Sequence, residues 1–170
     1  MARNWTLQFE PRAMDTNSPS VAGSPSFLDT TLRPSVILDQ TTDQSVVLEG
    51  IVPDEYTGRG TLKLAILYGG NTTSTTLDAR IDVVTEFRTP GAAENLNADN
   101  YDATPDSDTL LFSATAYSLQ TKVIPLTPVV TPAIGDKFRI KVTRDADNAS
   151  NLDDFADKLH IVGAEFYEEI

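Results

Sequence analysis

Apolar and polar residues alternate over several short stretches of this chain. The segment 5–9 reads Trp-Thr-Leu-Gln-Phe, and the segment 137–143 reads Lys-Phe-Arg-Ile-Lys-Val-Thr. A period of two turns successive side chains to opposite faces of a β-strand, so that one face can be buried while the other is solvated. Both segments therefore predict half-buried strands.

Further runs of apolar or β-branched residues predict more strands. Gly, Pro, Asn and Asp, which favour turns, separate these runs. The additional strands are expected at 36–38, 46–52, 62–68, 80–87, 110–117, 121–126 and 159–167. In the last of them, unbroken alternation places Leu159 and Tyr167 on one face and His160 on the other.

Only one segment favours helix. Residues 151–158 could form one or two turns, because Asp153 and Asp154 suit a helix start and Leu152 and Phe155 could face the core. Short strands with so little helix predict an all-β, two-sheet sandwich. A jelly roll of about eight strands is the expected architecture.

Residues 10–34 differ in kind from the predicted strands. Prolines recur among small polar residues there, a composition that resists sheet formation and favours an extended chain. We expect residues 1–34 to form an N-terminal strand and an extended arm, which lies on the sandwich or reaches a neighbouring subunit, and residues 35–170 to form the jelly roll. A second polar stretch, 89–108, is long enough to predict a loop that is either functional or mobile.

Composition narrows the range of partners. The 170 residues include 25 acidic and 13 basic ones, which gives a net charge of −12. Nucleic acids and anionic membranes both attract clustered Lys and Arg, so this charge argues against either partner. The absence of cysteine excludes disulfides and thiolate chemistry. The chain has neither a signal-peptide-like start nor an apolar run of membrane-spanning length, so we expect synthesis in the cytoplasm.

Signals for catalysis are weak. His160 is the only histidine, it lies in a predicted strand, and no G-x-S-x-G serine motif accompanies it. Glu49, Glu86 and Glu165 also lie in predicted strands, and a glycosidase would need two such carboxylates. With 25 acidic residues such positions arise by chance, and a solvated face or an arginine partner explains each one. We therefore predict that the protein is not an enzyme.

The acidic loop 145–154 is the one candidate metal site. Asp145, Asp147 and Asp153 could supply oxygen ligands for Ca²⁺. The EF-hand pattern fails, since Ala156 stands where that pattern requires Glu. A solvated loop is the favoured interpretation and a looser calcium site is the alternative. No other cofactor is expected.

Two regions of the chain resemble phage virion proteins. Residues 47–58 and 62–68 place a strand, a proline, a polar loop with Tyr and Gly, and a second strand in an order common in bacteriophage jelly-roll structural proteins. Residues 135–145 and 159–167 contain a Gly-Asp turn, a basic-apolar strand and a closing strand with an aromatic pair. This second region is similar to the last hairpin of those proteins.

The resemblance implies a jelly-roll protein of a tailed-phage particle, either a capsid decoration (cement) protein or a component of a head or tail fibre, without catalytic residues. The expected function is to bind the outer capsid surface of the virion and to stabilise contacts between capsid subunits. The expected partners are the major capsid protein and further copies of this chain in a homo-oligomer such as a trimer. The expected contact residues are Trp5, Phe9, Pro11, Phe27, Arg33, Tyr56, Arg59 and Tyr101.

The alternative function is a β-sandwich module that binds a receptor or a carbohydrate, for example in a tail fibre. This alternative predicts an exposed aromatic platform, for which Tyr56, Tyr68 and Tyr101 are the candidates. Copy number would separate the two functions, because a cement protein is far more abundant in a particle than a receptor binder.

Overall fold

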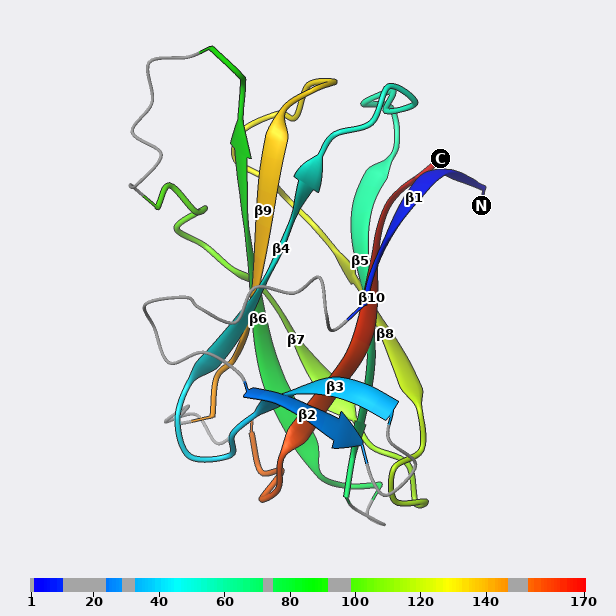
Figure 1. Ribbon diagram of the computed structural model, residues 1–170, viewed down its shortest axis with the longest axis vertical. Helices are drawn as coiled ribbons and strands as arrows, with labels where there is room; N and C mark the ends of the chain where they lie inside the picture. Colours follow the sequence, from blue (N-terminus) through cyan, green and yellow to red (C-terminus); the bar gives the residue numbers. More distant parts are fainter. Residues whose placement is uncertain (1, 11–23, 29–32, 72–74, 92–98, 147–152) are drawn as a thin grey trace.

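The computed structural model describes residues 2–10, 24–28, 33–71, 75–91, 99–146 and 153–170. These residues form ten β-strands in two antiparallel sheets that pack face to face (Figure 1). They include no helix, and hence none that could span a membrane. The two chain ends lie side by side, where Ala2 and Ile170 exchange backbone hydrogen bonds of 3.0 and 3.3 Å.

The two sheets have jelly-roll topology. The first has the order β2 (Ser24–Leu28), β3 (Arg33–Leu38), β10 (Leu159–Glu169), β5 (Thr61–Gly70) and β8 (Gln120–Pro125), and β1 (Arg3–Phe9) also pairs with β10. The second has the order β4 (Gln44–Ile51), β9 (Lys137–Arg144), β6 (Asp78–Arg88) and β7 (Asp106–Leu111). The division of the last eight strands into β3-β10-β5-β8 and β4-β9-β6-β7 corresponds to the two Greek keys of a jelly roll. The predicted fold class is confirmed.

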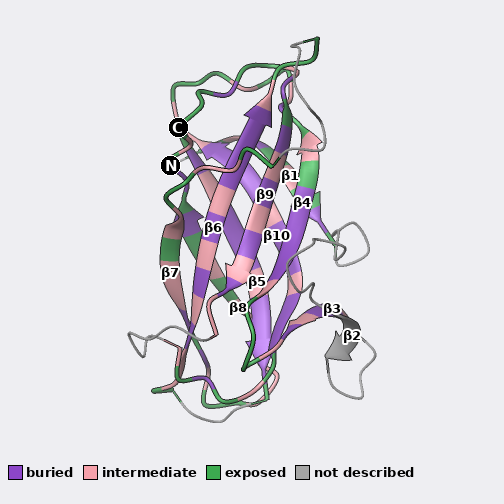
Figure 2. Ribbon diagram, turned by 90° about the vertical axis from the view of Figure 1, so that its left-hand side faces the viewer, coloured by how far each residue is buried: buried purple, intermediate pink, exposed green. Residues whose placement is uncertain are grey.

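The core lies between the sheets and is built from alternate residues of each strand. In β9, Phe138, Ile140 and Val142 are buried, and the residues between them face outward (Figure 2). In β1, Trp5 and Phe9 face the same core. The alternation found at 5–9 and 137–143 therefore predicted both strands and their buried faces correctly.

In β10 the predicted faces are only half right. Leu159 and Ile161, from one side of the predicted alternation, face the core, but Ala164 and Phe166, from its other side, face the core in the second half of the strand. The pairing of β10 with β5 shifts register between Ile161 and Gly163. A bulge of this kind inserts one extra residue, so the period of two resumes on the opposite face.

The arm was expected to stay outside any sheet, and this is wrong for its last part. Strand β2, which contains Pro25, pairs along its length with β3. Proline is tolerated there because β2 is an edge strand, which leaves one row of backbone N–H groups unpaired. Strand β3 also crosses the expected boundary at residue 34. Residues 11–23 lie outside the described residues.

Two further expectations fail near the end of the sandwich away from the chain termini. The strand expected at 110–117 ends at Leu111, because Phe112 leaves the sheet and stacks on Phe155 at 3.8 Å between ring centroids. The described part of the expected helix, 153–158, is irregular. In this irregular segment, Arg144 donates hydrogen bonds to the carbonyl groups of Phe155 and Asp157.

Candidate binding site at one end of the sandwich

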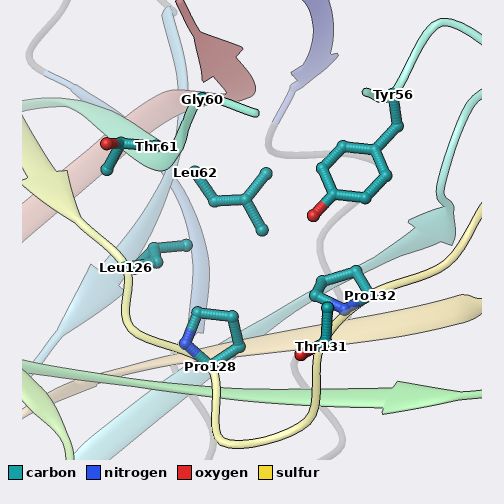
Figure 3. A pocket seen from close by; sticks show the side chains of 8 residues that line it. All are labelled: Tyr56, Gly60, Thr61, Leu62, Leu126, Pro128, Thr131 and Pro132. Carbon is teal, nitrogen blue, oxygen red and sulfur yellow. The ribbon is translucent and has the colours of Figure 1, made fainter. Parts of the chain in front are cut away.

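A pocket of about 290 Å³ lies at the end of the sandwich near the chain termini. Its walls come from two loops, the β4–β5 loop and the segment that follows β8, and Figure 3 shows Tyr56 of the first loop facing the prolines of the second across Leu62. The lining side chains are hydroxyl-bearing or apolar. The lining residues are Tyr56, Gly60, Thr61, Leu62, Leu126, Pro128, Thr131 and Pro132.

Tyr56 is positioned by the aromatic core. Its ring packs edge-on against Trp5 at 6.4 Å between centroids, and Trp5 packs edge-on against Phe166 at 5.0 Å. The hydroxyl points into the pocket (Figure 3). Burial raises the pKa of Tyr56, and the negative charge of Glu168 raises this pKa further. The Tyr56 hydroxyl therefore stays protonated and can both donate and accept a hydrogen bond.

Glu168 holds the loop that carries Tyr56. Its carboxylate is fully buried and accepts hydrogen bonds from the backbone N–H groups of Thr57, Arg59 and Gly60, each at 3.0 Å. The Thr57 hydroxyl and the Asn4 amide add further hydrogen bonds at 2.9 to 3.1 Å. These donors close the β4–β5 loop around one carboxylate.

The protonation state of Glu168 follows from these donors. Burial by itself would raise its pKa, but the hydrogen bonds from Thr57, Gly60 and Asn4 outweigh burial and lower the pKa to about 2. No Lys or Arg side chain of the described residues forms an ion pair with Glu168. A negative charge that has no cationic partner in the described part of the chain therefore lies beside the pocket.

The opposite wall, residues 126–136, is also anchored by carboxylates. The backbone N–H of Thr127 donates to Asp106 at 2.8 Å, and the backbone N–H of Ala133 donates to Asp136 at the same distance. Hydrogen bonds to ionised groups are among the stronger ones in proteins. Both loops of the pocket are thus fixed before any ligand arrives.

The second loop also carries apolar side chains that reach into solvent. Val129, Val130 and Ile134 are 76%, 52% and 53% exposed, and Ile51 at the end of β4 is 63% exposed. Ile51 and Ile134 are close in the fold because β4 pairs with the start of β9 and the backbone of Val52 bonds to Gly135. The run 126–135 contains no charged residue. The second loop is therefore an uncharged, partly apolar surface beside the pocket, whereas the β4–β5 loop carries exposed Asp54, Glu55 and Arg59.

A second cleft, of about 260 Å³, lies on the outer face of the second sheet. Arg139 forms ion pairs there with Glu49 at 3.1 Å, Glu86 at 3.2 Å and Asp99 at 2.9 Å. Tyr101, whose pKa burial raises to about 12, packs over the Arg139 guanidinium at 5.0 Å from the ring centroid. Lys137 and Arg88, which also line the cleft, pair with Glu49 and Glu86. The cations of this cleft are neutralised by carboxylates of the protein itself.

The structure corrects the expected contact surface at two residues. Trp5 and Phe9 are 8% and 7% exposed, so they belong to the core and offer little surface to a partner. The pattern that predicted their strand also buries them, because they occupy its apolar face. Arg59 is exposed on the β4–β5 loop, Tyr56 lines the pocket, and Tyr101 lies on the outer face of the second sheet. Pro11 lies outside the described residues, as do the side chains of Phe27 and Arg33.

The expected aromatic platform does not form. Tyr68 is a core residue, and its hydroxyl donates to the carbonyl of Leu111 at 2.6 Å. Tyr101 is covered by Arg139 and Lys141 at 5.0 and 4.6 Å from its ring centroid. Of the three tyrosines, Tyr56 alone lines the pocket at the end of the sandwich.

The carboxylates that could have suggested a glycosidase all have cationic partners. Glu49 and Glu86 pair with Arg139, and Glu165 pairs with Arg3 at 2.6 Å. The arginine-partner interpretation of these residues is confirmed. His160 is buried, and its Nδ1 lies 3.0 Å from the Ser35 hydroxyl, which is a structural contact.

The calcium interpretation fails at Asp153. Both of its carboxylate oxygens accept hydrogen bonds from Arg144 at 2.8 Å, which leaves the side chain committed to an ion pair. The described residues contain no group of three or more potential ligands placed to hold a metal ion. Asp145 is half-buried, and Asp147 lies outside the described residues.

The wall at 126–136 was missed from the sequence. Its local signal is the absence of charge over ten residues, 126–135, in a chain of which 22% is charged. Glu168 was missed because its burial depends on the β10 bulge, which places it on the core side of the strand.

The sequence matches no protein-family profile and no curated protein. In fold, the chain is similar to the K1 cleaved adhesin domain of Lys-gingipain from Porphyromonas gingivalis W83, with a TM-score of 0.54 and 11% identity over 98% of this chain and 99% of that one. It is also similar to a family 35 carbohydrate binding module from an environmental isolate, with a TM-score of 0.52 and 15% identity over 94% and 91% of the two chains. An exo-beta-1,3-galactanase from Phanerochaete chrysosporium is similar with a TM-score of 0.50 and 10% identity, but the match covers 96% of this chain and 29% of that enzyme.

At such identities these similarities show the fold alone. They support the resemblance to phage virion proteins only as far as a jelly-roll β-sandwich is concerned, because the three structures are an adhesin domain, a binding module and a glycosidase. The chain is an all-β jelly-roll sandwich with a pocket held between two anchored loops at one end.

Proposed function

We propose that this protein is a non-catalytic binding module that holds a carbohydrate in the pocket beside Tyr56. The observation that carries the proposal is the pocket itself, in which a tyrosine hydroxyl and apolar walls meet between two fixed loops. This function corresponds to the alternative drawn from the sequence, with a single-tyrosine pocket in place of an aromatic platform.

The chemistry of the lining suits a sugar. A sugar ring presents C–H groups on its faces and hydroxyl groups at its edge. Leu62, Pro128 and Pro132 supply apolar contact, and the hydroxyls of Tyr56 and Thr131 are available to bond polar groups. Sites of this kind combine mostly apolar walls with a few placed polar groups. A volume of about 290 Å³ is at the lower end of the range for small-molecule sites.

Preorganisation supports binding over a purely structural role. The loop of Tyr56 closes around Glu168, and the facing wall is held by Asp106 and Asp136. A loop that is already ordered loses little entropy when a ligand binds, which favours affinity. The similar folds of an adhesin domain and a carbohydrate binding module agree with this class of function and do not by themselves establish it.

The test is a screen of immobilised glycans, followed by calorimetric titration of each hit with three variants. Tyr56→Phe removes only the hydroxyl and keeps the ring on Trp5. The loss of one hydrogen bond of about 1 kcal/mol should weaken binding roughly fivefold. Thr131→Val should have a similar effect, because it is nearly isosteric. Tyr101→Phe, on the outer face of the second sheet, is the matched control and should bind like the wild type.

Two results would contradict the proposal. One is the absence of binding to any glycan by a folded protein. The other is a glycan that binds equally well to the Tyr56→Phe and Thr131→Val variants, which would place binding elsewhere on the molecule.

We propose attachment to another protein as a second candidate, favoured by the exposure of Val129, Val130 and Ile134 at the rim. Exposed apolar residues that cluster often mark protein contacts. Decoration of a phage capsid, with the capsid protein as partner, is one form of this function and rests on the sequence resemblance. Replacing Val129 and Val130 by Ser should release the protein from such a particle in a density gradient. Particle binding that survives this change would contradict the second candidate.

A further inference from the structure

The ionisable groups around the Tyr56 pocket are distributed unevenly. The lining contains no Lys, Arg, Asp or Glu. The charge closest to it in the hydrogen-bond network is the carboxylate of Glu168, which accepts a hydrogen bond from the backbone of Gly60, a residue of the lining. This carboxylate is fully buried, and its hydrogen-bond donors among the described residues are all neutral: backbone N–H groups, the Thr57 hydroxyl and the Asn4 amide. The pocket therefore has a fixed negative charge beneath it.

From this arrangement we infer that the Tyr56 pocket takes sugars without a negative charge and rejects acidic ones, an inference that rests on the proposed carbohydrate binding. A uronate or sulfated sugar would leave water for a site whose lining offers its charge no cation, and Arg59, the cation next to the lining residue Gly60, is exposed to solvent. Removing an anion from water without such a partner is costly. The Glu168 carboxylate and the net charge of −12 would repel it further.

The distribution of cations points the same way. Arg88, Lys137 and Arg139 gather in the separate cleft on the outer face of the second sheet, where carboxylates of the protein neutralise them. An acidic sugar would have to displace Glu49 or Asp99 to reach these cations. A neutral sugar has a CH₂OH group in place of the carboxylate. At the Tyr56 pocket it therefore has no charge to remove from water and is not repelled by the negative charge of the protein. The discrimination thus comes from the pocket's surroundings as much as from its lining.

The experiment compares matched monosaccharides by calorimetry: glucose against glucuronate, and galactose against galacturonate. The neutral member of a pair should bind at least roughly tenfold tighter than the acidic one at low salt, and added salt should narrow the gap. Thr131→Lys places a cation in the lining and should raise the affinity for the acidic sugar relative to the neutral one. Thr121→Lys, an equal change of charge on the exposed face of β8, is the control and should leave the ratio unchanged.

The outcomes separate this inference from the proposed function. If an acidic sugar binds the wild type as tightly as its neutral counterpart, the inference is wrong and carbohydrate binding stands. Loss of that binding in Lys137→Gln would then locate the acidic ligand in the charged cleft. If no sugar of either kind binds, the proposed function itself fails. The remaining outcome is that the wild type prefers the neutral sugar, that Thr131→Lys reduces this preference and that Thr121→Lys leaves it unchanged. This outcome supports both the inference and the proposed function.

Discussion

The carboxylate of Glu168 and Thr57 share three hydrogen bonds, one from the Thr57 backbone N–H at 3.0 Å and two from its hydroxyl at 2.9 and 3.1 Å. The two residues are 111 positions apart, on the last strand and on the β4–β5 loop. The contact joins the chain's last strand to the loop that forms one wall of the pocket. The position of Tyr56, one residue before Thr57, depends on it.

Glu168→Gln should therefore destabilise the protein. The substituted amide turns an NH₂ group toward backbone donors, which leaves buried N–H groups without an acceptor. We expect a loss of about 1–3 kcal/mol in the free energy of unfolding, measured by urea denaturation. Glu55→Gln makes the same change at an exposed position of the β4–β5 loop and should shift stability by less than about 0.5 kcal/mol. Equal stability of the two variants would show that the Glu168 contacts contribute little.

The same residue predicts an acid-sensitive fold. The folded-state pKa of Glu168 is about 2, below the ordinary value of 4.5, so folding favours the ionised form. Its contribution is complete above about pH 4.5 and is lost as the pH falls from there towards 2. Unfolding free energies measured between pH 6 and pH 2 should converge for the wild type and Glu168→Gln at the acid end. Parallel curves across this range would contradict the assignment.

The fold class could be predicted from the sequence because the alternation of apolar and polar residues along a strand indicates which of its faces is buried. The alternation at 137–143 marks one buried face, and β9 has that face in the core. The bulge after Ile161 has no comparable signal, since it arises from the pairing of β10 with β5. The order of apolar residues cannot show a one-residue insertion that only the partner strand reveals.

The site was less predictable for a related reason. Tyr56 was a candidate because it is an aromatic residue in a polar loop, but its pocket depends on Thr131 and Pro132, more than seventy positions later. Glu168 lies in an apolar strand and looks like a solvated edge residue until the bulge places it inside. Contacts between distant loops follow from topology, which local patterns do not contain.

Arg144 provides a second test of a buried charge. Its side chain is fully buried, pairs with Asp153 through two hydrogen bonds of 2.8 Å, and binds the carbonyl of Asp157 at 2.6 Å. Arg144→Met would leave Asp153 charged and unpaired, at an expected cost of about 3–5 kcal/mol in urea denaturation. Combining it with Asp153→Leu should recover part of this loss. Lys122→Gln, which breaks the more exposed pair with Asp108, should cost no more than about 1 kcal/mol.

The burial of His160 predicts a second pH dependence of folding stability, this one near neutral pH. The ring is buried against Ser35, and burial lowers its pKa below the ordinary 6.5, although Asp157 partly opposes this effect. Folding therefore favours the neutral ring, so its contribution is complete above about pH 6.5 and declines as the pH falls through the lower folded-state value. The melting temperature of the wild type should drop between pH 7.5 and pH 5 by more than that of His160→Gln, which cannot titrate. Glu168, with a pKa of about 2, stays ionised over this range and cannot cause the difference. An NMR titration that gives His160 a pKa above 6.5 would reverse the sign of the effect and contradict the prediction.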